Sequence, residues 1–159
     1  MICAAGVLQG QYLQPEEFPL ETFEFVMDVN VKGRSLHEVC DPLCWPPGPK
    51  VHAPDRLCAG VIGGSSSIAY GTSKGVNGMG MVLASHLASR KIRVNVICPG
   101  SLNTEMKRNV IQTQAEREGR DPDTVIANAE LGAPIGVARL LAYLASDDGD
   151  YVRRNLFTR

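Results

Sequence analysis

The chain has 159 residues, of which 21% are charged, and its formal net charge is −1. This length corresponds to one domain, and the balanced charge does not favour a nucleic-acid or anionic-membrane partner. No apolar run approaches the roughly 20 residues that span a bilayer, and no basic region precedes an apolar stretch at the N-terminus, so we expect a cytoplasmic protein with neither a membrane nor a nucleic-acid partner.

The first part of the chain predicts the end of a strand and one helix. Residues 1–7 form an apolar run typical of a buried strand, and residues 10–18 are expected to form a loop. A helix begins at Pro19, because proline is favoured in the first helical turn, and its apolar residues recur at spacings of three and four. Asn30 lies on or beside the apolar face of this helix, where an amide is either a hydrogen-bonded core group or a functional group.

Residues 41–58 differ in composition from their surroundings. They contain five of the ten prolines, so we expect neither a helix nor a central strand there and predict a loosely packed linker. Cysteines and histidines near this interval could be read as metal ligands, but no compact Cys-x-x-Cys pair occurs, so we predict no metal site. These residues are His37, Cys40, Cys44, His52 and Cys58. The five cysteines of the chain are odd in number and unevenly spaced, which indicates reduced thiols.

A tyrosine and a lysine stand four residues apart at the start of the next predicted helix, which runs from Tyr70 to about Arg90. This spacing places Tyr70 and Lys74 on one face of the helix. An ammonium held near a phenol stabilises the phenolate and lowers the pKa of the phenol from its usual value near 10, which suits a general acid or base. The same spacing also occurs in amphipathic helices in which the lysine stem covers the ring, and the pair alone does not decide between these interpretations.

The remaining pattern predicts alternating helices and strands. The later elements are expected in this order: a strand over residues 92–98, a turn at Pro99 and Gly100, a helix or lid over residues 102–118, a turn at 119–123, a helix over 135–146 and an edge strand over 151–159.

These motifs occur together in a known order. Tyr-x-x-x-Lys, a helix, the strand Arg-Val-Asn-Val and Pro-Gly-x-x-x-Thr, which ends at Thr104, resemble the short-chain dehydrogenase/reductase family. Cys3-Ala4-Ala5-Gly6 resembles the Asn-Asn-Ala-Gly strand end of that family, and the helix with Asn30 resembles its active-site asparagine helix. The resemblance implies an α/β fold with a partial Rossmann-like doubly wound parallel sheet. The chain would form a single incomplete NAD(P)-binding domain, interrupted at 41–58.

The resemblance also implies an activity. The chain would belong to NAD(P)-dependent oxidoreductases that interconvert a secondary alcohol and a ketone, with a small-molecule substrate and a homo-oligomeric assembly in intact relatives. Tyr70 would exchange a proton with the substrate oxygen, Lys74 would lower the pKa of Tyr70 and hold the nicotinamide ribose, and Asn30 would support a proton relay. The residues implied in binding NAD or NADP are Ala4, Ala5, Gly6, Tyr70, Lys74, Pro99, Gly100 and Thr104.

Departures from the family pattern favour an alternative. The phosphate-binding turn Thr-Gly-x-x-x-Gly-x-Gly does not occur in the 159 residues, which we interpret as an N-terminal truncation, and residues 36–58 resemble a splice or gene-model replacement. Leu57 stands thirteen residues before Tyr70, where the family has a serine that hydrogen-bonds the substrate carbonyl, and the serines at 65–67 are expected to be ordinary loop residues. Arg154 replaces a family glycine, which predicts looser packing. The alternative is a catalytically impaired remnant that acts at most as a dimerisation partner.

Overall fold

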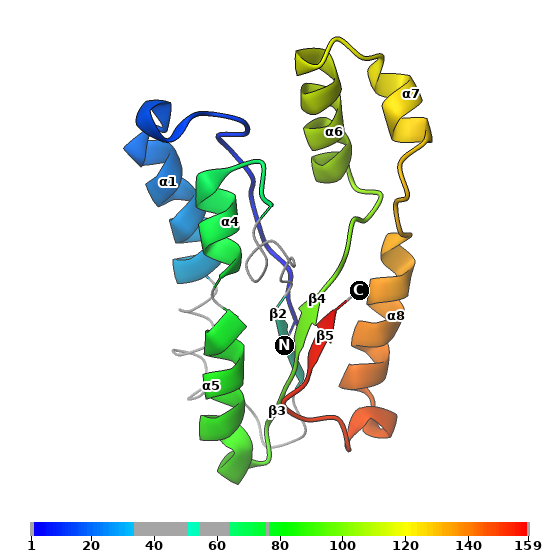
Figure 1. Ribbon diagram of the computed structural model, residues 1–159. Helices are drawn as coiled ribbons and strands as arrows, with labels where there is room; N and C mark the ends of the chain where they lie inside the picture. Colours follow the sequence, from blue (N-terminus) through cyan, green and yellow to red (C-terminus); the bar gives the residue numbers. More distant parts are fainter. Residues whose placement is uncertain (1, 34–50, 55–63, 76, 159) are drawn as a thin grey trace.

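The computed structural model describes residues 2–33, 51–54, 64–75 and 77–158. Short parallel strands lie at the centre of the molecule, and helices lie on both sides of them (Figure 1). The main elements are β1 (Ile2–Cys3), α1 (Leu20–Met27), the π-helical turn η2 (Asp28–Lys32), β2 (Val51–Pro54), α4 (Ile68–Lys74), α5 (Asn77–Leu87), β3 (Arg93–Val94), β4 (Val96–Cys98), α6 (Glu105–Arg117), α7 (Pro122–Ala127), α8 (Pro134–Ala145) and β5 (Leu156–Thr158). Three short 3-10 turns lie at Pro15–Glu17, Ala88–Arg90 and Asp147–Gly149. This is the predicted α/β architecture.

Every strand pairing among the described residues is parallel. β2 pairs with β1 on one side and with β3 on the other, and β4 pairs with β5, where Ile97 lies opposite Phe157. Asn95 alone separates β3 from β4. Residues 93–98 therefore form one extended segment whose first part pairs with β2 and whose second part pairs with β5. Parallel neighbours need crossover connections, and α4 with α5 and then α8 provide them.

β2 lies inside the interval 41–58, so our expectation that no central strand forms there is wrong. Ala53 of β2 lies opposite Ile2 of β1. The residues between Pro49 and Pro54 contain no proline. A proline at the last strand position also favours an extended residue before it and removes no donor from the strand interior. The rest of the interval, including the predicted loose linker, lies outside the described residues.

Two small hydrophobic clusters fix the extended segment between helices on opposite sides. Leu144 of α8, which is 0% exposed, packs against Ile97 of β4. On the other side, Ala84 and Leu87 of α5 pack against Val94 of β3. Figure 1 shows α5 and α8 flanking the strands in this way. Burial of these apolar side chains supplies the main driving force for holding the layers together.

The predicted helix over residues 70–90 is divided into two helices. α4 ends at Lys74, and Gly75 donates its N–H to the Thr72 carbonyl oxygen at 3.0 Å in a turn that does not continue the helix. Glycine destabilises a helix by about 1 kcal/mol relative to alanine, so a break at Gly75 costs little. α5 then begins at Asn77.

The predicted N-terminal helix also changes geometry. α1 ends at Met27, and the chain continues as the π-helical turn η2, which contains Asn30. A π turn inserts an extra residue into the helical register and often marks a functional position. Asn30 lies in this turn and is buried.

The later elements agree with the sequence prediction except at α7 and at the C-terminal strand, because β5 covers only Leu156–Thr158 of the predicted edge strand 151–159. α7 begins at Pro122, inside the predicted turn 119–123. Its signals were present in the sequence: Asp121 accepts a hydrogen bond from the Thr124 N–H at 3.0 Å, and proline stands at the first helical position. α6 begins at Glu105, because Thr104 forms its N-cap.

A buried arginine joins the extended segment to the end of α8. Arg93 is 1% exposed, and its Nη1 donates to the carbonyl oxygens of Leu144 at 2.8 Å and Gly149 at 2.6 Å. Its Nη2 donates to the Ser146 carbonyl oxygen at 3.3 Å, and its Nε lies 3.6 Å from Asp150 Oδ1, an ion-pair distance that is too long for a hydrogen bond. Carbonyl groups at a helix end have no partner within the helix, and the guanidinium supplies one.

Asn95 fixes the turn that leads into β5. Its Nδ2 donates to the Val152 carbonyl oxygen at 3.0 Å, and its Oδ1 accepts from the Asn155 N–H at 3.1 Å. In that turn Arg154 has a φ of 59° and donates its N–H to the Val94 carbonyl oxygen at 2.9 Å. The arginine side chain is exposed, so the cost of replacing glycine is conformational, about 1 kcal/mol, rather than a loss of packing.

Candidate active site

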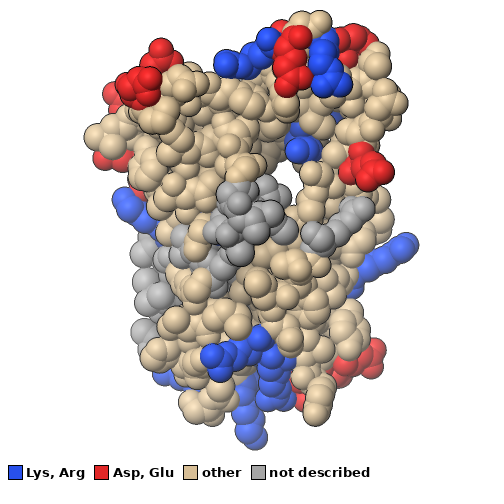
Figure 2. All heavy atoms as spheres, viewed as in Figure 1, with Lys and Arg blue, Asp and Glu red and all other residues tan. Residues whose placement is uncertain are grey.

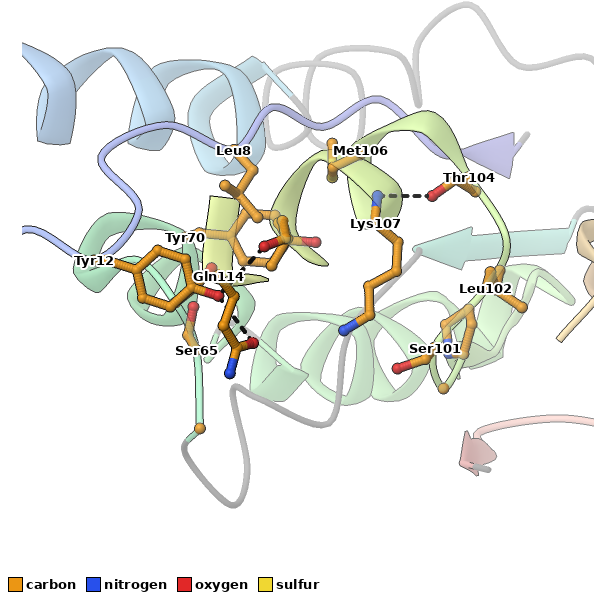
Figure 3. A pocket seen from close by; sticks show the side chains of 15 residues that line it. Leu8, Tyr12, Ser65, Tyr70, Ser101, Leu102, Thr104, Met106, Lys107 and Gln114 are labelled. Atoms are coloured by element: carbon orange, nitrogen blue, oxygen red, sulfur yellow. Dashed lines mark hydrogen bonds between the residues drawn. The ribbon is translucent and has the colours of Figure 1, made fainter. Parts of the chain in front are cut away.

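A pocket of about 480 Å³ lies between the core of the fold and α6. Figure 2 shows an opening between the part that carries α1 and α4 and the part that carries α6 and α7. One wall consists of Leu8, Tyr12, Gly64, Ser65, Ser66 and Tyr70. Residues 99–102 form the connection, and the α6 side contributes Thr104, Met106, Lys107, Val110 and Gln114 (Figure 3).

Tyr70 stands in the first turn of α4. Ser67 caps that helix, because its Oγ accepts a hydrogen bond from the Tyr70 N–H at 3.3 Å and donates to the Gln9 carbonyl oxygen at 2.6 Å. The cap therefore joins the start of α4 to the loop after β1. Tyr70 is only 7% exposed, but it still lines the pocket.

Lys74 lies one helical turn after Tyr70. Its side chain is 2% exposed, and its Nζ lies 4.8 Å from the centroid of the Tyr70 ring. The two side chains thus share one face of α4, as the spacing of four predicted. The contact has the geometry of a cation–π pair.

Asn30 links the loop after β1 to α4. It is 1% exposed, and its Oδ1 accepts from the Val7 N–H at 2.8 Å. Its Nδ2 donates to the Val7 carbonyl oxygen at 2.9 Å and to Ser73 Oγ at 2.9 Å. Ser73 Oγ in turn donates to the Tyr70 carbonyl oxygen at 2.8 Å. The sequence predicted Asn30 as a functional residue but contained no specific signal for Ser73 beyond its position beside Lys74.

Gly6 lies beside both of these polar groups. A Cβ atom placed on Gly6 would stand 3.5 Å from Asn30 Oδ1 and 3.8 Å from Lys74 Nζ. Ala4 and Ala5 are exposed and do not line the pocket. The structure therefore brings Gly6, Asn30 and Lys74 together and leaves the two alanines outside this group.

The three residues predicted at the nicotinamide end line the same pocket as Tyr70. Pro99 and Gly100 follow β4, and Thr104 precedes α6, where its Oγ1 accepts from the Lys107 N–H at 3.3 Å. The turn is held by the segment that precedes α8, because the Asn103 N–H donates to the Gly132 carbonyl oxygen at 2.8 Å.

The serines before Tyr70 lie in the loop, as expected, and two of them also line the pocket. Ser65 Oγ donates to the Ser67 carbonyl oxygen at 2.8 Å. A Cβ atom on Gly71 would stand only 2.9 Å from Ser65 Cβ, so the loop packs this closely against α4 only because residue 71 is glycine. Leu57, at the position of the family serine, lies outside the described residues.

Sequence reasoning missed Tyr12, which connects the two walls. Its Oη donates to Gln114 Oε1 at 3.3 Å and lies 3.5 Å from the Val110 carbonyl oxygen, and its ring centroid lies 5.4 Å from Arg117 Cζ. Burial, together with the charge of Glu118, raises the pKa of Tyr12, and the Arg117 charge opposes this change. These partners lie about a hundred residues further along the chain, so no local pattern indicates the contact.

Lys107 was also missed, although a weak signal exists. It lies in the first turn of α6, where the positive end of the helix dipole disfavours a cation, and such a local conflict often marks a functional position.

No helix in the described ranges is both long and apolar enough to cross a bilayer. Among the described side chains, no group of three or more His, Cys, Asp or Glu residues could hold a metal ion. His37, Cys40, Cys44 and Cys58 lie outside the described residues.

The chain is similar to proteins of known family. A family model described as enoyl-(acyl carrier protein) reductase matches residues 1–155. An uncharacterized oxidoreductase of Methylorubrum extorquens is 33% identical over 138 residues, which cover 86% of this chain and 55% of the relative. The chain spans about half the length of the curated relatives it matches.

Solved structures agree with the parallel architecture. A short chain dehydrogenase family protein from Francisella tularensis superposes with a TM-score of 0.86 at 26% identity, and the match covers 99% of this chain and 67% of that one. The landomycin C-6 ketoreductase LanV, solved with NADP and rabelomycin, superposes with a TM-score of 0.72 at 25% identity and covers 99% and 58%. The predicted partial Rossmann-like sheet is confirmed, and the chain belongs to the short-chain dehydrogenase/reductase family of oxidoreductases.

Proposed function

We propose that the chain carries the alcohol–ketone site of an NAD(P)-dependent oxidoreductase. The observation that carries the proposal is the placement of Tyr70, which lines the pocket with the Lys74 ammonium 4.8 Å from its ring centroid. The name of the Methylorubrum relative and the bound NADP of the LanV ketoreductase support the same reaction class.

Each polar residue has a distinct role in this proposal. In the direction of reduction, the Tyr70 hydroxyl donates its proton to the ketone oxygen, and in oxidation it accepts the proton from the alcohol. The Lys74 ammonium stabilises the negative charge that this transfer leaves on the phenol oxygen. Asn30 holds Val7 and Ser73 in place and so positions the face of α4 that carries Lys74, and it supports the relay of protons from the lysine.

The residues present fit one end of a nicotinamide cofactor. Pro99, Gly100 and Thr104 line the same pocket as Tyr70, so they would hold the nicotinamide. Lys74 would hold its ribose, and the strand end with Gly6, preceded by Ala4 and Ala5, would lie along the adenosine side. When bound, the cofactor supplies or accepts the hydride. The phosphate-binding turn of the family is not among the 159 residues.

A chimera tests this assignment. The phosphate-binding first half of a relative is joined to this chain, and NADPH and NADH oxidation is measured with a panel of ketones. Tyr70→Phe should lower the rate at least about a hundredfold, the usual contribution of a general acid or base. Tyr12→Phe, which removes a hydroxyl from the same pocket, serves as the matched control and should keep most of the rate. If Tyr70→Phe keeps its rate, Tyr70 is not the acid or base.

One observation favours the alternative of a catalytically impaired remnant: Leu57 stands at the position of the family serine. Titration of the 159-residue chain with NADH and NADPH separates the two hypotheses, because an enzyme site requires saturable binding. A dissociation constant below about 10 µM, equivalent to roughly −7 kcal/mol, supports the enzyme, and the remnant hypothesis predicts no saturation.

The homo-oligomer is likewise a proposal. Phe25 of α1 and Val82 of α5 are apolar and exposed, and they offer a surface for a second copy of the chain. Light scattering of Phe25→Ser and Val82→Ser variants tests this proposal, because both variants should shift a dimer toward monomer. An unchanged mass would show that this surface does not form the interface.

A further inference from the structure

The charge of the pocket lining is uneven. Among the described residues that line the pocket, Lys107 is the only one with a charged side chain, and the others are apolar, hydroxyl-bearing, amide or glycine residues. No carboxylate among them balances the ammonium. Lys107 is therefore the one side chain in the described lining whose charge attracts an anion.

Lys107 has no ionic partner in the described part of the chain. Its neighbour Arg108 donates to Asn103 Oδ1 at 2.8 Å, and Arg120 pairs with Glu118 at 3.1 Å, but none of the described carboxylates forms an ion pair with Lys107. The side chain is half-buried in the pocket lining, and an anionic ligand in the pocket would give its ammonium an ionic partner.

The position of Lys107 relates it to the proposed reaction. Tyr70 belongs to one wall of the pocket and Lys107 to the other. Figure 3 shows the Lys107 side chain extended away from its backbone, on the side of the pocket where Ser101 is drawn. Apolar side chains of Leu8, Met106 and Val110 line the same pocket. A ligand that carries a carbonyl group and an anionic group on an apolar frame matches these three kinds of lining group.

We propose that Lys107 binds the anionic group, a carboxylate or a phosphate, of the ligand that occupies the pocket. This deepens the proposed function, on which it rests for the carbonyl end at Tyr70. Two sources share this chemistry: an acid group on the substrate and the diphosphate of a nicotinamide cofactor. The charge-assisted contact is the same in both cases. The two sources are distinguished by whether Lys107 is required to bind a carboxylate probe or a pyrophosphate probe.

The test uses the 159-residue chain without a cofactor. Dissociation constants are measured by ligand-observed NMR for 4-oxocyclohexanecarboxylate, for its uncharged methyl ester and for inorganic pyrophosphate. Lys107→Gln removes the charge, Lys107→Arg keeps it, and Arg108→Gln removes an exposed charge from the next position of α6 as the matched control. Loss of one charge-assisted contact weakens binding about ten- to a hundredfold.

We expect Lys107→Gln to weaken the binding of an anionic probe by this factor and to leave the binding of the ester unchanged. Lys107→Arg should bind the anionic probe nearly as tightly as the parent chain, and Arg108→Gln should bind it equally tightly. A Lys107-dependent carboxylate identifies the substrate as the source, and Lys107-dependent pyrophosphate identifies the cofactor. Equal binding of both anions to the parent and to Lys107→Gln overturns the proposal, as does an absence of binding to the parent. Because no cofactor is present, these outcomes are independent of whether the chimera oxidises NADPH.

Discussion

The Asn30 cluster, which comprises Val7, Asn30, Ser73 and Lys74, and the α6–α7 arm, residues 105–127, are both rich in side-chain hydrogen bonds. In the cluster, Asn30 and Lys74 are almost completely buried. In the arm, the pair from Gln112 to Glu116 at 2.9 Å is exposed, as are most of the other polar contacts. A buried hydrogen bond that is broken leaves groups without water, whereas an exposed one is exchanged for water at little cost. Burial, rather than the number of hydrogen bonds, therefore decides how costly it is to open each region.

The connection between the two regions is small. Among the described residues, Tyr12 provides side-chain contacts from the loop after β1 to Gln114 and Arg117 of α6. At the base of the arm, the Gly132 N–H donates to the Ser101 carbonyl oxygen at 2.9 Å. The Tyr70 wall is therefore fixed by the core, and the Lys107 wall is attached mainly at its two ends.

We expect the largest loss of stability when Arg93 is replaced, and Arg120 serves as the control. Arg93→Met removes three hydrogen bonds to carbonyl oxygens at the end of α8 and should lower the free energy of unfolding by about 4 kcal/mol, since bonds from a charged donor contribute about 1.5–3 kcal/mol each and desolvation offsets part of this. Arg120→Met, in the turn of the arm, should leave the urea midpoint unchanged. Equal urea midpoints for the two variants would contradict the idea that the buried hydrogen bonds stabilise the fold more than the exposed ones.

The second prediction tests the cluster itself. Asn30→Ala leaves the N–H and carbonyl groups of Val7 and the Ser73 hydroxyl without their partner and should cost about 3 kcal/mol in urea unfolding. Asn128→Ala, which removes one exposed bond to the Thr124 carbonyl oxygen at the end of α7, is the control and should change the midpoint little. A small decrease in the free energy of unfolding for Asn30→Ala would show that water enters the cluster and replaces the hydrogen bonds of Asn30.

The third prediction concerns the connection. Tyr12→Phe keeps the ring beside Arg117 but loses the hydroxyl contacts to Gln114 and Val110, so it should cost only about 0.5 kcal/mol in stability. Hydrogen exchange of α6 amides should nevertheless become faster, while exchange at Val7 stays the same. Tyr143→Phe, on exposed α8, controls for loss of a phenol hydroxyl. Unchanged hydrogen exchange in α6 would show that the connections at the two ends of the arm hold it in place without Tyr12.

The smallest effect is a local response to acid in the arm. Hydrogen bonds from the Thr124 hydroxyl and N–H hold the pKa of Asp121 below its ordinary value of 3.8. A lowered pKa means that the N-cap contribution is present above 3.8 and is lost as the pH falls through the folded-state pKa. The Thr124 amide should therefore shift in NMR spectra below pH 3.8, whereas the Val7 amide should not. Asp121→Asn keeps an acceptor and should remove the titration; a Thr124 shift that persists in this variant would assign it to another group.

Local patterns predicted much of the fold. Residues 135–146 follow a helical period, and the helix is observed at Pro134–Ala145, because a continuous apolar stripe needs no distant information to indicate a helix. The spacing of Tyr70 and Lys74 likewise placed both side chains on one face. β2 was missed because its four residues are held by β1 and β3, so pairing with neighbours outweighed the proline-rich composition around it.

The sequence by itself determined the family resemblance, the α/β class and the shared face of Tyr70 and Lys74, since each depends on residue types at fixed short spacings. The tertiary structure alone decided that Asn30 bonds Val7 and Ser73, that Tyr12 reaches α6, and that Lys107 shares a pocket with Tyr70. These contacts join residues 23 to about a hundred positions apart, and the cost of closing such loops is met by the packing of the whole domain rather than by any local preference.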